Sequence, residues 1–401
     1  MAVLFLLGFS GGLPLMLTSQ TLQAWMTAVK LDLGSIADLS AVGLAYTFKF
    51  LWAPLLDRYR LPFLGRRRGW CLLFQVLLIG AIILLGAIDP LAHPVELAAL
   101  AVAVAFLSAS QDVIIDAYKV DILAPHERGA GSAMYVLGYR FALLISGTLA
   151  LVMADHMPWH TVYAIMAATM VIGIVGTLLA DEPAEAAGAP RTLQTALVQP
   201  FVEFWRRLGP RGLALVFGFA ALYRFGDYFA QALLVAFLHD ETKFSFTEIG
   251  VVYKGVGFAG MAIGALFAGS LITRFGLRRM LVAFGALAAV TNILYVWLAI
   301  VGHNLPIFCA AVAVDHVSTA FGTTAFLAVL MGVTSPAVSA TQFALLTSMS
   351  SIGMRLFGPL ADDVVVAVGW PGFFATTAAM ALPGLGLAWW VARREPEPKA
   401  V

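Results

Sequence analysis

Long apolar stretches alternate along this chain with short connections that contain proline, glycine or clustered charges. A helix needs about 20 mostly apolar residues to cross the hydrocarbon core of a bilayer. The connections cut the chain into segments of roughly that length. We therefore predict an all-α polytopic membrane protein with about twelve transmembrane helices, over residues 2–28, 38–57, 69–88, 94–123, 130–153, 159–180, 212–238, 247–273, 277–300, 305–333, 338–361 and 370–392.

One connection, over residues 181–211, is longer and more polar than the others. It begins with a stretch rich in proline, alanine and glycine and continues as an amphipathic run over 193–208, which we interpret as a helix lying on the membrane surface. We therefore divide the chain into an N-terminal six-helix half, a linker and a C-terminal six-helix half, at residues 1–182, 183–211 and 212–401.

The composition supports a membrane protein. Apolar and aromatic residues make up 61% of the 401 residues and charged residues only 12%, whereas soluble domains contain about 25% charged residues. The net charge of +1 argues against a nucleic-acid partner, so the expected partners are the lipid bilayer and a small-molecule substrate. We expect a monomer. We also expect no cofactor and no metal, because the seven histidines form no metal-ligand spacing.

Basic residues lie almost entirely in every second connection. The connections after predicted helices 2, 4, 6 and 8, together with the C-terminus, contain 16 of the 24 lysines and arginines, and the opposite connections contain only Lys30 and Lys243. Six further basic residues fall inside predicted helices. Since basic residues gather on the cytoplasmic side of a membrane, we expect both termini in the cytoplasm.

The two halves repeat one local pattern. The second predicted helix ends in Asp57-Arg58, with Gly65-Arg66-Arg67-Arg68 after it, and the eighth ends in Thr273-Arg274, with Gly276-Leu277-Arg278-Arg279 after it. This resembles the Gly-x-Leu-x-Asp-Arg-x-Gly-Arg-Arg loop of the major facilitator superfamily. The departures are Ala53 at the first glycine, a longer insertion before Gly65, and Thr273 in place of the acid. The resemblance implies two six-helix halves around a central cavity.

An acid at a helix end that pairs with clustered arginines in one conformation and releases them in another acts as a gate. The alternative is that the arginines only determine the orientation of the chain in the membrane. We assign gate roles to the residues of both loops and to an acid near the end of the fourth predicted helix: Asp57, Arg58, Arg66, Asp121, Arg274 and Arg278.

Charges inside a bilayer are costly, so each one within a predicted helix indicates a function or a partner. These charges are Lys49, Asp112, Asp116, Lys119, Asp121, Arg140, Arg224, Asp227, Lys254, Asp315 and Arg355. Asp112, Asp116 and Lys119 share one face of a helix by their spacing. Two acids beside one base leave a carboxylate that can take up and release a proton, so we predict proton coupling at these three residues.

Arg224 and Asp227 repeat a similar spacing on the seventh predicted helix. They either face a polar cavity or form an ion pair that holds this helix in place, and Lys254 and Arg355 either cap backbone carbonyls or pair with Asp315. The sequence leaves these alternatives open.

Further motifs extend from the first predicted helix to the eleventh, as Leu7-Gly8-Phe9-Ser10-Gly11-Gly12-Leu13-Pro14-Leu15, Phe48-Lys49-Phe50-Leu51-Trp52-Ala53-Pro54, Ala109-Ser110-Gln111-Asp112-Val113 and Ser339-Ala340-Thr341-Gln342-Phe343. Together these motifs resemble the muropeptide permeases of Gram-negative bacteria, the AmpG type. The resemblance implies proton-driven import of N-acetylglucosaminyl-1,6-anhydro-N-acetylmuramyl peptides across the inner membrane, a step in peptidoglycan recycling and β-lactamase induction.

A disaccharide-peptide presents hydroxyls, amides and carboxylates, so its carrier needs cations and hydrogen-bonding side chains. We predict substrate contacts from polar and basic residues of the helices: Gln20, Gln23, Tyr46, Lys49, Gln111, Arg140, Tyr223, Arg224, Asp227, Lys254, Gln342 and Arg355.

Other functions compete with this one. An acetyl-CoA-type transporter shares the Phe-Lys-x-Leu-Trp-Ala-Pro stretch and also carries a large polar anion. A membrane-embedded enzyme is disfavoured, because the sequence contains no His-Glu-x-x-His or Gly-x-Ser-x-Gly motif. A passive channel would not need the buried acids.

Overall fold

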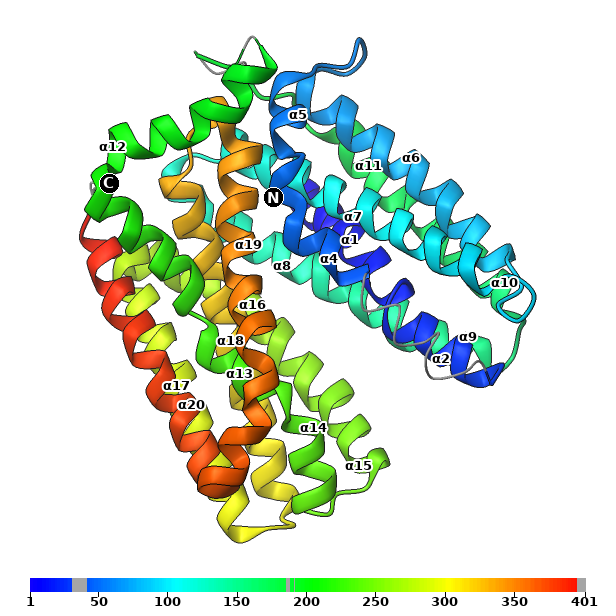
Figure 1. Cartoon of the computed structure of the whole chain (residues 1–401), viewed down its shortest axis with the longest axis vertical. Coiled ribbons are helices and arrows are strands. Elements are labelled where there is room, and N and C mark those ends of the chain that lie inside the picture. The colour runs from blue at the N-terminus through cyan, green and yellow to red at the C-terminus, as the bar shows by residue number, and fades with distance from the viewer. Residues whose placement is uncertain (31–41, 185–187, 191, 395–401) are drawn as a thin grey trace. The chain divides into compact units, whose positions relative to one another are not determined.

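The computed structural model describes residues 1–30, 42–184, 188–190 and 192–394, and at 246, 254, 352–356, 359 and 392–394 it describes the backbone alone. Throughout these ranges all regular structure is helical, which confirms the predicted all-α class. The chain folds into two compact units (Figure 1). Unit 1 comprises Met1–Leu123, Met134–Pro200 and Thr334–Ser348, and unit 2 comprises Ala124–Ala133, Phe201–Val333 and Met349–Val401.

Each unit contains most of one predicted half and one short segment from the other. The start of the fifth predicted helix belongs to unit 2, and the start of the eleventh belongs to unit 1. The predicted boundaries at 182/183 and 211/212 divide the chain into continuous segments. The compact units are not continuous, because each contains one helix end from the other half.

Unit 1 is built around α6, which packs against α7, α10 and α11 (Figure 1). Its helices are α1 (Ala2–Leu17), α2 (Gln20–Ala28), α4 (Val42–Phe48), α5 (Ala53–Arg58), α6 (Arg66–Ala87), α7 (Pro94–Ile122), α8 (Arg128–Leu144), α9 (Ala150–Ala154), α10 (Trp159–Thr169) and α11 (Val171–Leu179). The first residues of α8, up to Ala133, belong to unit 2. A 3₁₀ turn over Lys49–Leu51 joins α4 to α5, and a π-helical turn over Ile145–Leu149 joins α8 to α9.

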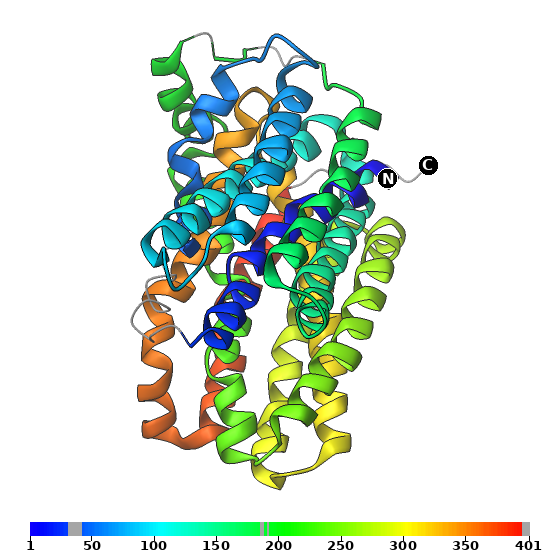
Figure 2. The same ribbon diagram turned by 90° about the vertical axis from the view of Figure 1, so that its right-hand side faces the viewer.

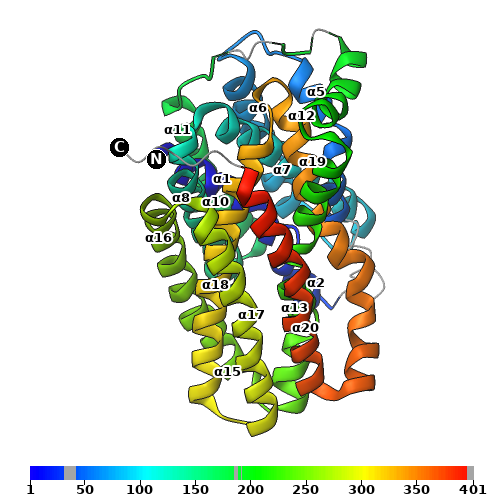
Figure 3. The ribbon, with the colours of Figure 1, turned by 90° about the vertical axis from the view of Figure 1, so that its left-hand side faces the viewer.

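Unit 2 is built around α17, which packs against α18 and α20 (Figure 3), while α16 runs beside α18 (Figure 2). The remaining helices of the chain are α12 (Leu193–Leu222), α13 (Phe225–Ala232), α14 (Leu234–Ala236), α15 (Phe246–Val251), α16 (Phe258–Phe275), α17 (Leu277–Val301), α18 (Leu305–Val333), α19 (Ser339–Phe357) and α20 (Ala361–Arg394). A π-helical turn over Val252–Gly257 joins α15 to α16.

Ten helices in the described residues are long and apolar enough to cross a membrane. The predicted spans 38–57 and 338–361 are not among them. The first is interrupted by the 3₁₀ turn at Lys49, and its residues 38–41 lie outside the described residues. The second is interrupted near its end by another 3₁₀ turn over Gly358–Leu360, after which the chain stays helical through 361–368.

Two glycines with positive φ, Gly369 and Gly209, break long helices. Gly369 has φ 70° and ψ 173°, and it breaks α20. The connection predicted over 362–369 was therefore wrong: those residues are helical up to Gly369. Gly209, with φ 67° and ψ 174°, breaks α12, so the amphipathic run 193–208 forms a helix of its own, as predicted. Positive φ favours glycine because a Cβ is strained there.

Helix packing in unit 1 depends on close backbone approach between α1 and α8. A Cβ on Gly138 of α8 would overlap the carbonyl oxygen of Phe5, and one on Gly8 of α1 would overlap that of Tyr135. Since lipid supplies little hydrophobic driving force between helices, small residues at such crossings provide the packing. Gly80 of α6, by contrast, has no atom within 4 Å of the Cβ position.

We expect the substitution Gly138→Ala to lower the free energy of unfolding by about 1–3 kcal/mol, because the added methyl group forces α1 and α8 apart. Gly80→Ala is the control and should leave stability unchanged or slightly raised. Thermal unfolding of the purified protein in detergent, followed by tryptophan fluorescence, measures both. Equal melting temperatures for the two variants would contradict this account of the crossing.

Candidate functional site

The predicted acidic face of α7 is buried in unit 1, where Asp116 lies between two lysines. Lys119 Nζ is 2.7 Å from Asp116 Oδ1, and Lys49 Nζ, from the 3₁₀ turn after α4, is 3.5 Å from Asp116 Oδ2. With Asp112 one turn away on α7, we call Lys49, Asp112, Asp116 and Lys119 the α7 cluster. Its two acids and two bases carry no net charge when all four are ionised.

Asp112 occupies the least compensated position in the α7 cluster. A Cβ on Gly11 of α1 would lie 2.9 Å from Asp112 Oδ1, so the glycine makes room for this carboxylate. The same oxygen is buried and has no hydrogen-bond donor among the described residues. A buried acceptor without a donor is destabilising, so Asp112 is suited to bind a proton or a donor group of a ligand.

The two lysines have different surroundings. Lys119 is fully buried, and its Nζ lies 3.5 Å from the ring centroid of Tyr135 and 5.5 Å from that of Phe343. The aromatic faces and Asp116 together compensate for the loss of hydration. Lys49 is 8% exposed and lies on an irregular turn. Lys119 is therefore fully enclosed, whereas Lys49 keeps a small exposed fraction.

Three basic residues of the predicted spans lie on irregular backbone. Lys49 begins a 3₁₀ turn, Arg224 separates α12 from α13 with φ −115° and ψ 9°, and the backbone of Lys254 belongs to the π-helical turn Val252–Gly257. Interrupted helices in transporters line substrate and ion sites, and π-helical turns are frequent at functional sites. The hydrophobic pattern alone did not show these interruptions.

In unit 2, Arg224 is buried and has three neighbours. Its Nε lies 3.9 Å from Asp227 Oδ2, its Nη1 donates a hydrogen bond of 2.6 Å to Thr323 Oγ1, and its guanidinium lies 4.9 Å from the ring centroid of Tyr228. Tyr223 points elsewhere: its hydroxyl donates to the Leu281 carbonyl at 2.8 Å, and its ring stacks on Phe326.

The other predicted substrate-contact residues differ in their exposure and in their protein partners. Gln20 and Gln23 are exposed on α2, and Tyr46 and Arg140 are half-buried. Gln111 is fully buried and donates to Ser10 Oγ at 3.0 Å, and Gln342 is fully buried between the Ser335 amide and the Pro200 carbonyl. The side chains of Lys254 and Arg355 lie outside the described residues.

Asp57, predicted as a gate acid, is buried at the end of α5 and binds both an arginine and a helix end. Arg67 Nη2 lies 3.1 Å from Asp57 Oδ1. The backbone amides of Ala340 and Thr341, in the first turn of α19, donate to the carboxylate at 3.1 and 2.9 Å, and the Thr341 hydroxyl donates at 2.8 Å. The first turn of a helix favours an anion in this way.

Asp121, the second predicted gate acid, completes this network from the end of α7. It pairs with Arg67 Nε at 2.7 Å and Arg66 Nη2 at 3.3 Å, and it accepts a hydrogen bond of 2.7 Å from Ser339 Oγ. Ser339 Oγ in turn accepts from Arg67 Nη2 at 2.6 Å. We call these residues the α19 cluster, with Asp57, Arg66, Arg67, Asp121, Ser339 and Thr341 as its members.

The sequence prediction missed the centre of the α19 cluster. Arg67 is 1% exposed and joins the two acids, yet it stands between two other arginines and no pattern distinguishes it. Of the predicted gate residues, Arg58 lies over the ring of Tyr59 and Arg274 over that of Phe275. Arg278 is half-buried, and it forms no ion pair with any described residue.

Arg68 and Glu182 join α6 to α11 rather than forming a gate. Glu182 accepts from the backbone amides of Arg67 and Arg68 at 2.8 and 3.0 Å, and Arg68 donates to the carbonyls of Thr177 and Leu178 at 3.0 and 2.8 Å. Each charge therefore caps the end of the neighbouring helix.

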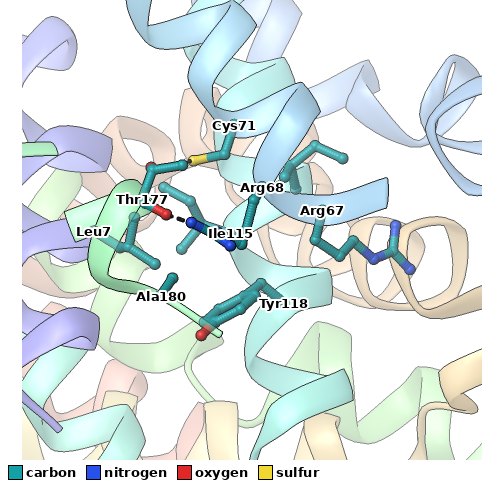
Figure 4. A pocket seen from close by; sticks show the side chains of 9 residues that line it. Leu7, Arg67, Arg68, Cys71, Ile115, Tyr118, Thr177 and Ala180 are labelled. Carbon is teal, nitrogen blue, oxygen red and sulfur yellow. Dashed lines mark hydrogen bonds between the residues drawn. The ribbon is translucent and has the colours of Figure 1, made fainter. Parts of the chain in front are cut away.

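A small pocket lies beneath this connection, with Cys71, Thr177, Ala180 and Tyr118 on its walls and Arg68 beside Thr177 (Figure 4). It offers about 10 Å³ to the centre of a water molecule, which is room for about one water. Its lining is mostly apolar, and Arg67 points away from it (Figure 4). It does not match a large polar substrate.

Interrupted helices, buried charge clusters and a repeated loop are typical of a solute transporter, and comparison with known sequences agrees. Residues 1–224 and residues 216–401 each match the sequence pattern of the Major Facilitator Superfamily. The chain therefore belongs to this superfamily and is a multi-pass membrane transporter, not an enzyme.

Particular relatives narrow the class. The chain is 46% identical to the anhydromuropeptide permease of Escherichia coli over 385 residues, which cover 96% of this chain and 78% of the relative. It is 28% identical to the putative transporter AmpG 4 of Rickettsia felis over 95% of this chain and 94% of the relative. These matches confirm the predicted resemblance to AmpG-type permeases.

Solved structures support the fold. The fucose:proton symporter FucP of E. coli has a TM-score of 0.71 and 14% identity, with 97% of both chains covered. The proton:xylose symporter XylE has a TM-score of 0.71 and 13% identity, with 98% of this chain and 95% of that chain covered. At such identities the likeness concerns the fold alone.

We expect Asp57→Asn to lower the free energy of unfolding by about 3–5 kcal/mol, because it leaves Arg67 buried with one acid fewer and places an amide group against donors. Arg58→Gln, at the adjacent position, is the control and should change stability little. Thermal unfolding in detergent compares them. A melting temperature of the Asp57 variant equal to that of the control would show that the pair is not a stabilising element.

Proposed function

We propose that this chain is a proton-coupled importer of cell-wall turnover muropeptides, N-acetylglucosaminyl-1,6-anhydro-N-acetylmuramyl peptides, which works by alternating access. The observation that carries this proposal is the 46% identity, over nearly the whole chain, to a protein named anhydromuropeptide permease. We place the protein in the bacterial inner membrane as a monomer, with both termini in the cytoplasm, as the distribution of basic residues predicts. Import then runs from periplasm to cytoplasm.

Charge balance in the α7 cluster supports coupling to protons. The cluster is neutral when Lys49, Asp112, Asp116 and Lys119 are all ionised, so an anionic substrate entering it adds an uncompensated charge in a poorly hydrated place. A proton bound by one of the acids restores the balance. Protonation of Asp116 also releases Lys49 from its 3.5 Å ion pair, and Lys49 is then available to a substrate carboxylate.

Arg224 of unit 2 is our second substrate anchor. Its ion pair with Asp227 is long, at 3.9 Å, whereas its hydrogen bond to Thr323 is short, at 2.6 Å. A carboxylate of the substrate can therefore compete with Asp227 for the guanidinium while Thr323 holds it in position. The guanidinium has several N–H donors in a fixed geometry, so it can bind the substrate carboxylate and the Asp227 carboxylate on different nitrogens.

The α19 cluster is our proposed gate. It joins the ends of α5, α6 and α7 to the first turn of α19, and all of its contacts are between polar groups that water can replace. Opening this end of the protein requires α19 to leave Asp57 and Arg67. The ion pairs Asp57–Arg67 and Arg67–Asp121 remain within α5, α6 and α7 when that happens, so the opened state keeps its charges compensated.

Uptake into proteoliposomes tests the proposal directly. Purified protein should accumulate labelled anhydro-muropeptide when an inward pH gradient is imposed, and a protonophore should abolish the accumulation. Acetyl-CoA, offered at the same concentration, should not enter. Accumulation of acetyl-CoA instead would assign the chain to that class of transporter, and equilibration without accumulation would indicate a channel.

We expect Asp116→Asn to abolish pH-gradient-driven accumulation while substrate binding and exchange of internal for external substrate continue. The amide imitates a protonated acid, so the cluster keeps its positive charge and no longer needs a proton. Accumulation at the wild-type rate would exclude Asp116 as the coupling residue. Loss of exchange as well would indicate a structural role.

We expect Lys49→Met to weaken binding of the anionic substrate about tenfold, since a charge-assisted hydrogen bond is worth about 1.5–3 kcal/mol. Methionine retains most of the volume, and Asp116 keeps Lys119 as its partner. Lys243→Met, at an exposed position, is the control and should not alter the affinity. Isothermal titration of both variants with muropeptide measures the difference, and equal affinities would exclude Lys49 as an anchor.

A further inference from the structure

Unit 2 contains a second group of buried titratable side chains, around Asp315 of α18. Asp315 is 7% exposed. Tyr295 of α17 donates a hydrogen bond of 3.5 Å to its Oδ2, and His316 Nδ1 lies 3.9 Å from the same oxygen. None of the functional roles given above uses this group.

The contacts of His316 determine which ring nitrogen can take up a proton. Nδ1 lies 2.9 Å from the carbonyl oxygen of Val312. A carbonyl oxygen only accepts hydrogen bonds, so Nδ1 carries a hydrogen there and the neutral ring has its lone pair on Nε2. Proton uptake at Nε2 produces an imidazolium beside the Asp315 carboxylate. The acid therefore stabilises the charged ring through an ion pair.

The backbone opposite His316 is shaped for this ring. Gly257 closes the π-helical turn Val252–Gly257, and a Cβ at Gly257 would lie 2.8 Å from His316 Nε2. The glycine thus lets the turn approach the nitrogen that receives the proton. Tyr253 of the same turn meets the imidazole edge to face, with ring centroids 5.3 Å apart.

Titratable and charged groups face Asp315 from several elements. Tyr295 faces it from α17 and Tyr253 from the π-helical turn, and Arg224 and Asp227 act on it from the break before α13 and from α13. His316 is the titratable neighbour on α18 itself. Lys254 belongs to the same π-helical turn, and its side chain lies outside the described residues.

We propose that Asp315 and His316 together form a second proton-binding site, in unit 2, which holds one proton during the transport cycle. The proton passes from water to His316 Nε2, the Asp315 carboxylate stabilises the resulting imidazolium as its counter-ion, and release of the proton restores the neutral ring. Because Nε2 faces the π-helical turn, protonation changes the contact between α18 and the turn that carries Lys254. This inference rests on the proposed proton-coupled function.

Two single substitutions test the site. Asp315→Asn removes the charge, and His316→Asn keeps a donor toward the Val312 carbonyl but has no nitrogen to protonate. In proteoliposomes we expect both to reduce pH-gradient-driven accumulation at least about tenfold, as for loss of a proton-transfer group, while exchange at equal pH stays near the wild-type rate. A merely structural role would lower accumulation and exchange together.

His303→Asn is the matched control. His303 Nε2 lies 3.5 Å from Glu248 Oε1, and both side chains are substantially exposed, so this pair resembles Asp315 and His316 in composition but not in burial. Its removal should leave the pH profile of uptake unchanged. A fall in accumulation equal to that of His316→Asn would overturn the assignment to the buried pair.

A measurement without substrate separates this inference from the proposed function. Infrared titration of the protein in liposomes records the bands of histidine rings, and His316→Asn should remove one titrating band whatever the transported solute is. If wild-type protein fails to accumulate muropeptide, the proposed function is refuted. The infrared titration still tests the proton-binding site in that case, because it needs no substrate. Proton-driven uptake with wild-type pH profiles in both variants would overturn the site.

Gly257→Ala supplies a variant that keeps both titratable groups. The added Cβ displaces the ring near Nε2, so we expect the pH at half-maximal uptake to shift from its wild-type value. The infrared titration should shift with it. If the variants at Asp315 and His316 do not fold, an unchanged pH profile and titration for Gly257→Ala overturn the proposal.

Discussion

Compensation of buried charge is the constraint on which the rest of this structure depends. The helices cross a region where an uncompensated ion costs several kcal/mol, and most of the buried ions described above are placed against an opposite charge, a hydrogen-bond donor or an aromatic face. Asp116 lies between two lysines, Arg67 joins two carboxylates, and Arg224 lies against Asp227, Thr323 and Tyr228. Helix positions follow from these pairings as much as from apolar packing.

The degree of compensation distinguishes the two clusters of unit 1. In the α19 cluster Asp57 has four donors from two helices, one on Arg67 of α6 and three in the first turn of α19. In the α7 cluster a carboxylate oxygen of Asp112 has none among the described residues. A carboxylate held by several donors favours one arrangement of its helices, whereas a carboxylate oxygen without a donor gains free energy when a proton or a ligand arrives. The first arrangement suits a gate and the second a binding site.

The sequence was sufficient for the class, for most helix positions and for the shared face of α7, because hydrophobic length and helical spacing are local properties. It was not sufficient for Arg67, whose partners Asp57, Asp121 and Ser339 come from three other helices. Nor did it separate Gln111 and Gln342, which serve helix packing and a loop, from residues that face a ligand. A polar residue in an apolar helix indicates a partner, and only the tertiary structure says whether that partner is protein.

The interrupted helices connect charge compensation to transport. A continuous helix satisfies its own backbone groups and is difficult to bend inside a membrane, whereas a 3₁₀ or π-helical turn provides a place where the helix can change direction. Lys49 and the backbone of Lys254 lie on such turns, and His316 lies against the second one. A change of charge at these positions therefore acts where the backbone is least constrained. Protonation can then alter helix geometry without breaking the regular packing of α6 or α17.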